Sequence, residues 1–131
     1  MRAGLLLLAA VSSAQAAPPN LAAGKAAFHQ CAECHAVGPG ASNGFAPQLN
    51  GIVGRAAGST RDFAYSAVLK NARFHWTEQN LDGFLYAPRD FLPGTKMLFW
   101  GISSRQERID LIAYLKTFAA VPAAGNTTAG K

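Results

Sequence analysis

The chain is poor in cysteine, in clustered basic residues and in long apolar segments. It has two cysteines and three histidines, and His29 and His75 form no second close pair that could complete a zinc site. The 12 lysines and arginines are scattered and form no run, which argues against nucleic acid as a partner. The apolar stretch Ala3–Val11 is too short to span a bilayer comfortably, so we expect no stable membrane insertion. No segment repeats, and no stretch shows the signals of a β-strand.

The first 16 residues have the pattern of a secretory signal peptide. Met1-Arg2 forms a short positive region, an uncharged apolar stretch follows, and residues 12–16 end in the small-residue pattern A-x-A. We expect cleavage after Ala16 and export to the periplasm, with an uncleaved anchor as the alternative. The rest of the chain is then expected to form one domain at residues 17–122 and a flexible, small and polar tail at residues 123–131.

Residues 31–35 read Cys-Ala-Glu-Cys-His, which is the C-x-x-C-H motif of covalent haem attachment. The thiols of Cys31 and Cys34 can add to the two vinyl groups of one porphyrin, and His35 is then placed to ligate the iron. The alternatives are a C-x-x-C disulfide and half of a zinc site, and neither needs a histidine at the next position. A thioredoxin-like dithiol would lie in a βαβ unit, which the sequence does not indicate. One covalent haem c is therefore the cofactor that we expect.

The chain has the pattern of helices joined by long loops, so we expect an all-α fold. Asn20 and Thr77 are expected N-caps, and Ser104 begins a Ser-Arg-Gln-Glu capping box. An apolar stripe that extends to Phe118 and Ala119 marks the last helix. The expected helices cover residues 20–31, 66–72, 77–87 and those from 104 onward, and the expected irregular segments are 36–62 and 91–101.

A six-coordinate haem iron needs a second axial ligand, and Met97 is the favoured candidate. Once Met1 is removed with the signal peptide, Met97 is the only methionine in the chain. It follows Pro-Gly-Thr-Lys in a loop whose backbone can approach a flat ligand closely. A histidine–methionine ligand pair raises the potential of a haem. The other candidates are His29, His75, a lysine or no second ligand at all, and without the haem motif a lone methionine would be assigned to the core.

From about Gly24 to Phe118 the chain resembles the class I cytochromes c, and it is similar to mitochondrial cytochrome c and the bacterial cytochromes c2. The resemblance implies the class I cytochrome c fold, with several helices and long loops wrapped around one covalent haem. It also implies a one-electron carrier and not an enzyme. The matching segments are residues 31–35 (CAECH), 49–55 (LNGIVGR), 63–65 (FAY), 93–99 (PGTKMLF) and 111–115 (LIAYL).

The resemblance assigns roles to the residues that match its motifs. It implies that Cys31 and Cys34 carry the thioether bonds and that His35 and Met97 ligate the iron. Pro47 matches the proline whose carbonyl accepts a hydrogen bond from the ligand imidazole, which fixes the ring and increases its basicity. The contact between the two terminal helices is matched by Gly24, Phe28, Leu111 and Tyr114.

Four more matches concern the haem propionates. Arg55, Tyr65 and Trp76 match residues that hold one propionate, and Thr95 matches a residue whose hydroxyl reaches the other. Such donors are needed because an unpaired buried charge is very costly. The alternatives are a solvated surface charge for Arg55 and ordinary core positions for Tyr65 and Trp76.

The chain departs from the family pattern on the expected distal side. Phe84 stands where the family usually has a tyrosine that donates a hydrogen bond to the methionine sulfur, and phenylalanine cannot donate it. Leu69 stands where an asparagine usually helps to hold an internal water. We therefore expect a drier distal side. A peroxidase or a gas-sensing module would need an open sixth position, against which Met97, Phe84 and Leu69 argue.

The expected partners are redox proteins of a respiratory or photosynthetic chain. A cytochrome bc1-type reductase is the expected donor, and a terminal oxidase or a reaction centre the expected acceptor. The formal net charge of +5 suits an acidic partner or an anionic membrane surface. Several lysines that surround the haem edge in mitochondrial cytochrome c are absent, although Arg89 and Lys96 remain and Asp90 replaces another. We expect a monomer.

Overall fold

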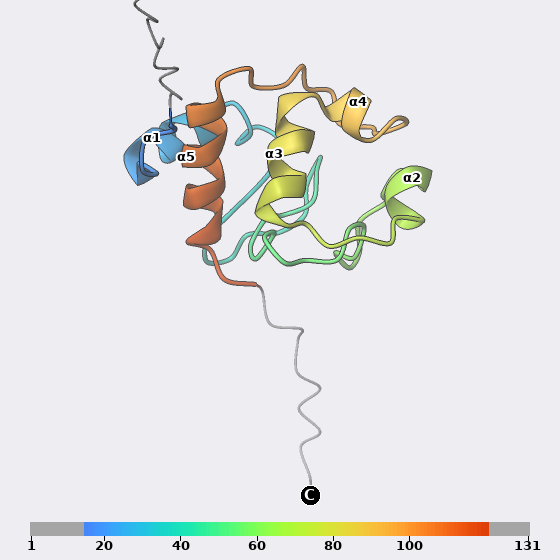
Figure 1. Cartoon of the computed structure of the whole chain (residues 1–131). Coiled ribbons are helices and arrows are strands. Elements are labelled where there is room, and N and C mark those ends of the chain that lie inside the picture. Colours follow the sequence, from blue (N-terminus) through green and yellow to red (C-terminus); the bar gives the residue numbers. More distant parts are fainter. Residues whose placement is uncertain (1–14, 121–131) are drawn as a thin grey trace, which may run out of the picture.

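The computed structural model describes residues 15–120, which form a small helical domain (Figure 1). Within these residues there is no β-strand, only an isolated bridge between Ala56 and His75, so the all-α prediction is confirmed. The predicted tail lies outside the described residues, as does all but the end of the predicted signal peptide. The helices of the described segment are α1 (Leu21–Phe28), α2 (Ala67–Lys70), α3 (Glu78–Tyr86), α4 (Pro88–Phe91) and α5 (Arg105–Lys116).

Residues 15–120 contain no helix whose length and apolar character would let it cross a bilayer.

Polar side chains fix where the three longer helices begin. The Asn20 side chain accepts a hydrogen bond from the Ala23 N–H at 3.0 Å, and Thr77 Oγ1 accepts one from the Asn80 N–H at 3.0 Å. Ser104 Oγ accepts from the Glu107 N–H at 3.3 Å. These bonds satisfy N–H groups that have no partner inside the helix, so the predicted N-caps are confirmed.

Two predicted helix ends are wrong, and α4 was not predicted. After Phe28 the chain leaves the regular helix and forms tight turns, in which the Cys31 N–H donates to the Phe28 carbonyl and the Cys34 N–H to the Cys31 carbonyl. The haem motif therefore lies in turns rather than at the end of a helix. Helix α5 ends at Lys116, so Phe118 and Ala119 lie beyond it. Helix α4 begins with a proline, whose fixed φ suits the first turn of a helix.

The most extensive contact between helices is the crossing of α1 and α5, which lie side by side in Figure 1. A side chain at Gly24 would overlap the Asp110 carbonyl and come within 2.8 Å of Tyr114 Cβ. The Phe28 and Tyr114 rings fill the crossing, with their centroids 5.8 Å apart. The Asn20 N–H also donates to Asp110 Oδ1 at 2.8 Å. This contact was expected from the resemblance, and it brings the turns after α1 against the core.

The long segment between the haem motif and α2 is irregular, as predicted, but it is tied to the rest of the fold. The Leu49 N–H donates to the Ala36 carbonyl at 2.9 Å, and the Gly51 N–H donates to the Phe118 carbonyl at 2.9 Å. Gly51 has a positive φ of 65°, and a side chain there would collide with the backbone of Ala120. These bonds hold the segment as one wall of a cavity.

Candidate haem-binding site

A cavity of about 370 Å³ lies between the helices and the two irregular segments. Apolar side chains dominate its lining. Residues far apart in the sequence reach it from the turns after α1, from the long loop, from α3 and from the segment before α5. The lining includes every residue for which the sequence predicted a role in the site: Cys31, Cys34, His35, Pro47, Arg55, Tyr65, Trp76, Thr95 and Met97.

The His35 ring is held by the backbone of the long loop. Its Nδ1 atom lies 2.7 Å from the Pro47 carbonyl oxygen. Because a carbonyl oxygen only accepts, the nitrogen facing it carries the proton, and the lone pair of the neutral ring lies on Nε2. Burial is the main effect on the pKa of His35 and lowers it. The hydrogen bond to the Pro47 carbonyl raises the pKa, and the positive charge of Arg55 lowers it. The ring is therefore kept in the neutral form that can bind a metal.

The two cysteines are free thiols on the same wall of the cavity. They form no disulfide in the structure, and Cys31 is partly buried whereas Cys34 is exposed. Burial raises the pKa of the Cys31 thiol to about 11, and Cys34 adds to this effect. Within residues 15–120, no group of three or more His, Cys, Asp and Glu side chains is placed to hold a metal ion. Zinc binding by the C-x-x-C pair is thus not supported.

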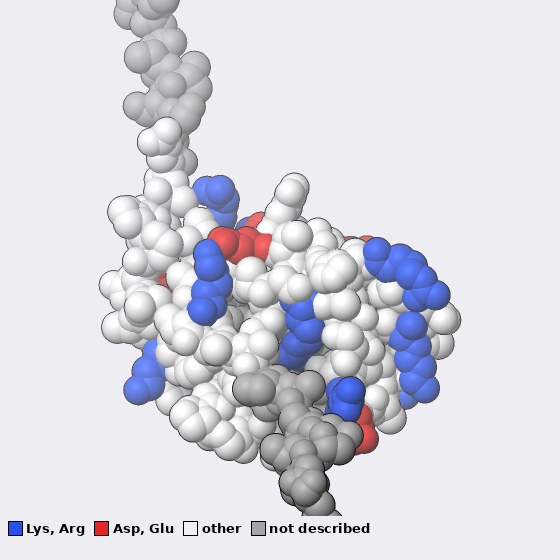
Figure 2. Space-filling view, turned by 90° about the horizontal axis from the view of Figure 1, so that it is seen from below, with Lys and Arg blue, Asp and Glu red and all other residues white. Residues whose placement is uncertain are grey.

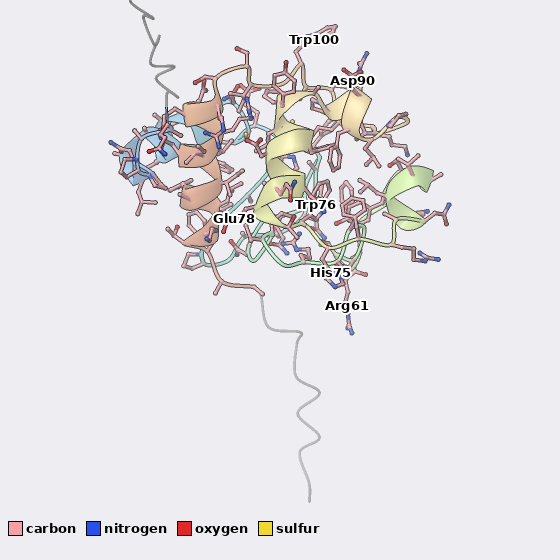
Figure 3. The ribbon with its side chains drawn as sticks, viewed as in Figure 1. Arg61, His75, Trp76, Glu78, Asp90 and Trp100 are labelled. Atoms are coloured by element: carbon pink, nitrogen blue, oxygen red, sulfur yellow. The ribbon has the colours of Figure 1, made fainter. Side chains whose placement is uncertain are left out.

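Met97 reaches the cavity from the segment between α4 and α5. Its N–H donates to Thr95 Oγ1 at 3.3 Å, and its half-buried side chain packs against the core. Gly94, with a φ of +90°, lets this segment turn closely over Val68 of α2. Of the alternative ligands, His29 and His75 are exposed and do not line the cavity, and Figure 3 shows His75 at the lower edge of the molecule. Lys96 does line it.

Comparisons with known proteins agree with this geometry. Residues 21–119 match the family described as cytochrome c. The chain belongs to the cytochrome c family. It is 46% identical to cytochrome c2 of Blastochloris viridis over 117 residues, which cover 89% of this chain and 91% of the relative. It is 44% identical to cytochrome c of Cannabis sativa over 107 residues, with 81% and 96% covered.

Solved structures show the same fold. Cytochrome cH from Methylobacterium extorquens superposes with a TM-score of 0.70 at 41% identity, over 75% of this chain and 98% of that structure. Cytochrome c2 from Rhodospirillum centenum gives a TM-score of 0.70 at 38% identity, over 77% and 99%. Family membership means that this chain is a monohaem electron carrier rather than an enzyme, and that its cofactor is one covalently bound haem c.

The polar wall of this cytochrome's cavity is organised by Arg55. Its guanidinium donates to the Gln48 carbonyl at 2.8 Å, to Thr60 Oγ1 at 2.9 Å and to the Asn50 carbonyl. Burial lowers the pKa of Arg55, while the neighbouring Tyr65 raises it. The sequence did not indicate Gln48, Asn50 or Thr60, because two of these acceptors are backbone carbonyls that no side-chain pattern reveals. Arg55 and Tyr65 meet at this wall, and the Trp76 N–H donates to the Arg55 carbonyl at 2.8 Å.

Ser66 was missed by the sequence interpretation, which assigned it only to a short helix. It is the N-cap residue of α2, yet its side chain makes no capping bond. Its hydroxyl is buried without a hydrogen-bond partner among the described residues, and the residue lines the cavity. Buried polar groups nearly always have a partner, so this hydroxyl points to a polar group of a ligand. Together with Arg55, it adds polar groups to a mainly apolar cavity, as a porphyrin with carboxylate side chains requires, so the residues fit haem c.

Proposed function

We propose that this cytochrome c carries single electrons between redox proteins in the periplasm, with its haem attached to Cys31 and Cys34 and ligated by His35 and Met97. The observation that carries the proposal is the pairing of His35 Nδ1 with the Pro47 carbonyl at 2.7 Å. This bond sets the tautomer and leaves Nε2 available for iron, beside both thiols and in the same cavity as Met97.

The chain's own residues then act in three ways. When bound, the haem supplies a one-electron Fe(III)/Fe(II) couple. The apolar lining excludes water from it, and Arg55, Tyr65, Ser66 and Thr95 are proposed to hold its propionates. Backbone hydrogen bonds fix the loops that carry His35 and Met97, and Thr95 Oγ1 accepts a further bond from the Met97 N–H, so the ligands need to move little when the charge changes.

Location and partners are the finer part of the proposal. The N-terminal signal-peptide pattern supports export to the periplasm. Similarity to cytochromes c2 of bacteria supports a donor such as a cytochrome bc1-type reductase and an acceptor such as a terminal oxidase or a reaction centre. The net charge is +5 for the whole sequence and +4 once Arg2 leaves with the signal peptide, and this positive charge suits acidic docking surfaces on these proteins. We propose that the carrier acts as a monomer.

The ligand assignment is tested with Met97→Ala and the control His29→Ala. For Met97→Ala we expect covalent haem to remain on a denaturing gel, the sulfur-to-iron charge-transfer band to disappear, the potential to fall and carbon monoxide to bind. His29 is exposed and outside the cavity, so His29→Ala should match the wild type in all four measurements. A Met97→Ala protein with the wild-type band and potential would exclude Met97 as the ligand. Cell fractionation tests the location.

A further inference from the structure

Trp100 is the most exposed large apolar residue described in the chain. Its side chain is 90% exposed, and Figure 3 shows it projecting from the upper edge of the molecule, on the side of α4. It lies two residues after Leu98, which is 81% exposed and lines the cavity. An exposed tryptophan next to a segment that lines a functional cavity indicates an interaction surface rather than ordinary solvent exposure.

Arg89 of α4 stacks on this tryptophan. The guanidinium carbon lies 5.4 Å from the centre of the Trp100 ring, within the range of a cation–π contact. Within the described part of the chain, Arg89 forms no ion pair. Its face is occupied by the indole, but its N–H edge can still bind a carboxylate with two parallel hydrogen bonds. We call Trp100 and Arg89 together the Trp100 anchor.

The surface around the anchor carries little net charge. Arg89 and Lys96 are positive and Asp90 is negative, so these three residues leave a single net positive charge. On the opposite, lower face, Figure 2 shows basic side chains dispersed over the surface rather than gathered in one patch. The surface around the anchor therefore lacks a dense ring of lysines that could attract an acidic partner. Trp and Arg are instead the residue types that most often dominate the binding energy of protein interfaces.

We propose that the Trp100 anchor is the docking contact of this carrier, and that its partner is a redox protein with an apolar docking patch that carries a carboxylate opposite Arg89. The proposal rests on the proposed function, because it names the surface through which electrons reach a partner. Leu98 connects the anchor to the cavity, so a partner seated on Trp100 approaches the rim of the haem site. A small apolar contact of this kind suits the weak, short-lived complexes of electron carriers.

The test measures oxidation of the ferrous haem-loaded protein by native membranes of the source organism, as kcat/KM across a salt series. The variants are Trp100→Ala, Arg89→Lys and Arg89→Gln. Leu21→Ala is the control for loss of an exposed apolar side chain, because Leu21 lies on α1 and does not line the cavity. Arg61→Gln is the control for loss of charge, because Figure 3 shows Arg61 at the lower edge, away from Trp100. Oxidation by hexacyanoferrate, a small molecule, is measured for each protein.

We expect Trp100→Ala to lower kcat/KM with membranes by about tenfold or more, at low and at high salt, because the lost contact is apolar. Arg89→Gln should lower it several-fold, mostly at low salt, and Arg89→Lys should recover only part of the loss because lysine cannot bind a carboxylate through a planar fork. The controls should stay near the wild type, and so should the hexacyanoferrate rates of all variants at high salt, where the attraction of this anion to basic residues is screened.

Equal losses in Trp100→Ala and Leu21→Ala would overturn the docking site and leave the carrier function standing. A matching fall in the hexacyanoferrate rate of Trp100→Ala would also overturn it, because the haem environment would then have changed. A wild-type protein that hexacyanoferrate oxidises but membranes do not would instead overturn the proposed function.

Discussion

Arg108 of α5 donates a hydrogen bond from Nε to Asp82 Oδ1 of α3 at 2.8 Å and so joins the two helices. Its Nη1 atom also donates to the carbonyls of Ile102 at 2.8 Å and Ser103 at 3.0 Å. These carbonyls end the segment that carries Met97. The Arg108 side chain is only 7% exposed, whereas that of Asp82 is 38% exposed. One buried guanidinium therefore fixes the Met97 segment to both α3 and α5.

The first prediction concerns this buried charge. Asp82→Asn keeps the shape of the side chain but removes the carboxylate that balances Arg108. We expect the free energy of unfolding to fall by about 1–3 kcal/mol, because the guanidinium stays buried and the carboxylate is only partly shielded from water. Guanidinium chloride unfolding of the haem-loaded protein measures the change.

The matched control for Asp82→Asn is the exposed ion pair between Lys116 and Glu78. Figure 3 shows Glu78 at the lower end of α3. The side chains of Lys116 and Glu78 are both about half exposed. Glu78→Gln should therefore lower the free energy of unfolding by less than about 1 kcal/mol. Equal losses in the two variants would show that the Arg108–Asp82 bond has no special role.

The second prediction concerns the crossing of α1 and α5. At Gly24 the Cβ of an alanine would overlap the Asp110 carbonyl, which is backbone and cannot rotate away. Gly24→Ala should therefore destabilise the protein by about 3 kcal/mol or more, through separation of the helices. At Gly44 nothing lies within 4 Å of the added carbon and φ is not positive, so Gly44→Ala should change stability by less than about 0.5 kcal/mol. Thermal unfolding compares the melting temperatures of the two variants. Similar melting temperatures would mean that α1 and α5 are not packed as described.

The sequence predicted the features that local chemistry determines. Asn20, Thr77 and Ser104 were identified as N-caps because a side-chain oxygen before a helix has few other uses. The family motifs also located the cavity-lining residues, since their order along the chain is characteristic. Helix ends were less predictable: the turns after Phe28 depend on backbone bonds such as that from the Cys31 N–H to the Phe28 carbonyl, which no residue pattern specifies.

Features that depend on tertiary packing could not be predicted. Ser66 has the sequence position of an ordinary helix cap, and only the fold shows its hydroxyl buried at the cavity. Trp100 follows an apolar run and would be assigned to a core, yet it is almost fully exposed. The stack of Arg89 on Trp100 joins two residues from separate segments, so sequence spacing gave no signal for it.

The third prediction concerns the distal side of the cavity. Phe84 is buried, lines the cavity as Met97 does, and packs on Trp76 with ring centroids 5.1 Å apart. Phe84→Tyr would place a hydroxyl donor in this apolar region. A hydrogen bond from it to the Met97 sulfur would withdraw electron density from the iron, so we expect a modest rise in potential by voltammetry. A lower potential in this variant would reject the electrostatic explanation, and Tyr86→Phe, which alters an exposed ring, provides the control.

The fourth prediction concerns the chain before it receives haem. Leaving the cavity of about 370 Å³ unfilled would cost about 9 kcal/mol at roughly 24 cal/mol per Å³. That cost is comparable with the whole stability of a typical domain, about 5–15 kcal/mol. We therefore expect the haem-free chain to be largely unfolded, with weak far-ultraviolet circular dichroism and no cooperative melting.

The alkylation rates of the two cysteines test whether the haem-free chain is unfolded. In the fold, burial raises the pKa of Cys31 from 9.0 to about 11, which would reduce its reactive thiolate about a hundredfold at pH 8. An unfolded chain loses that protection, so iodoacetamide at pH 8 should alkylate Cys31 and the exposed Cys34 at similar rates, as it does in urea. Peptide mass spectrometry at timed intervals gives both rates. A Cys31 that stays protected until the pH approaches 11 would show that the chain folds around its cavity without haem, and that side-chain packing alone stabilises this domain.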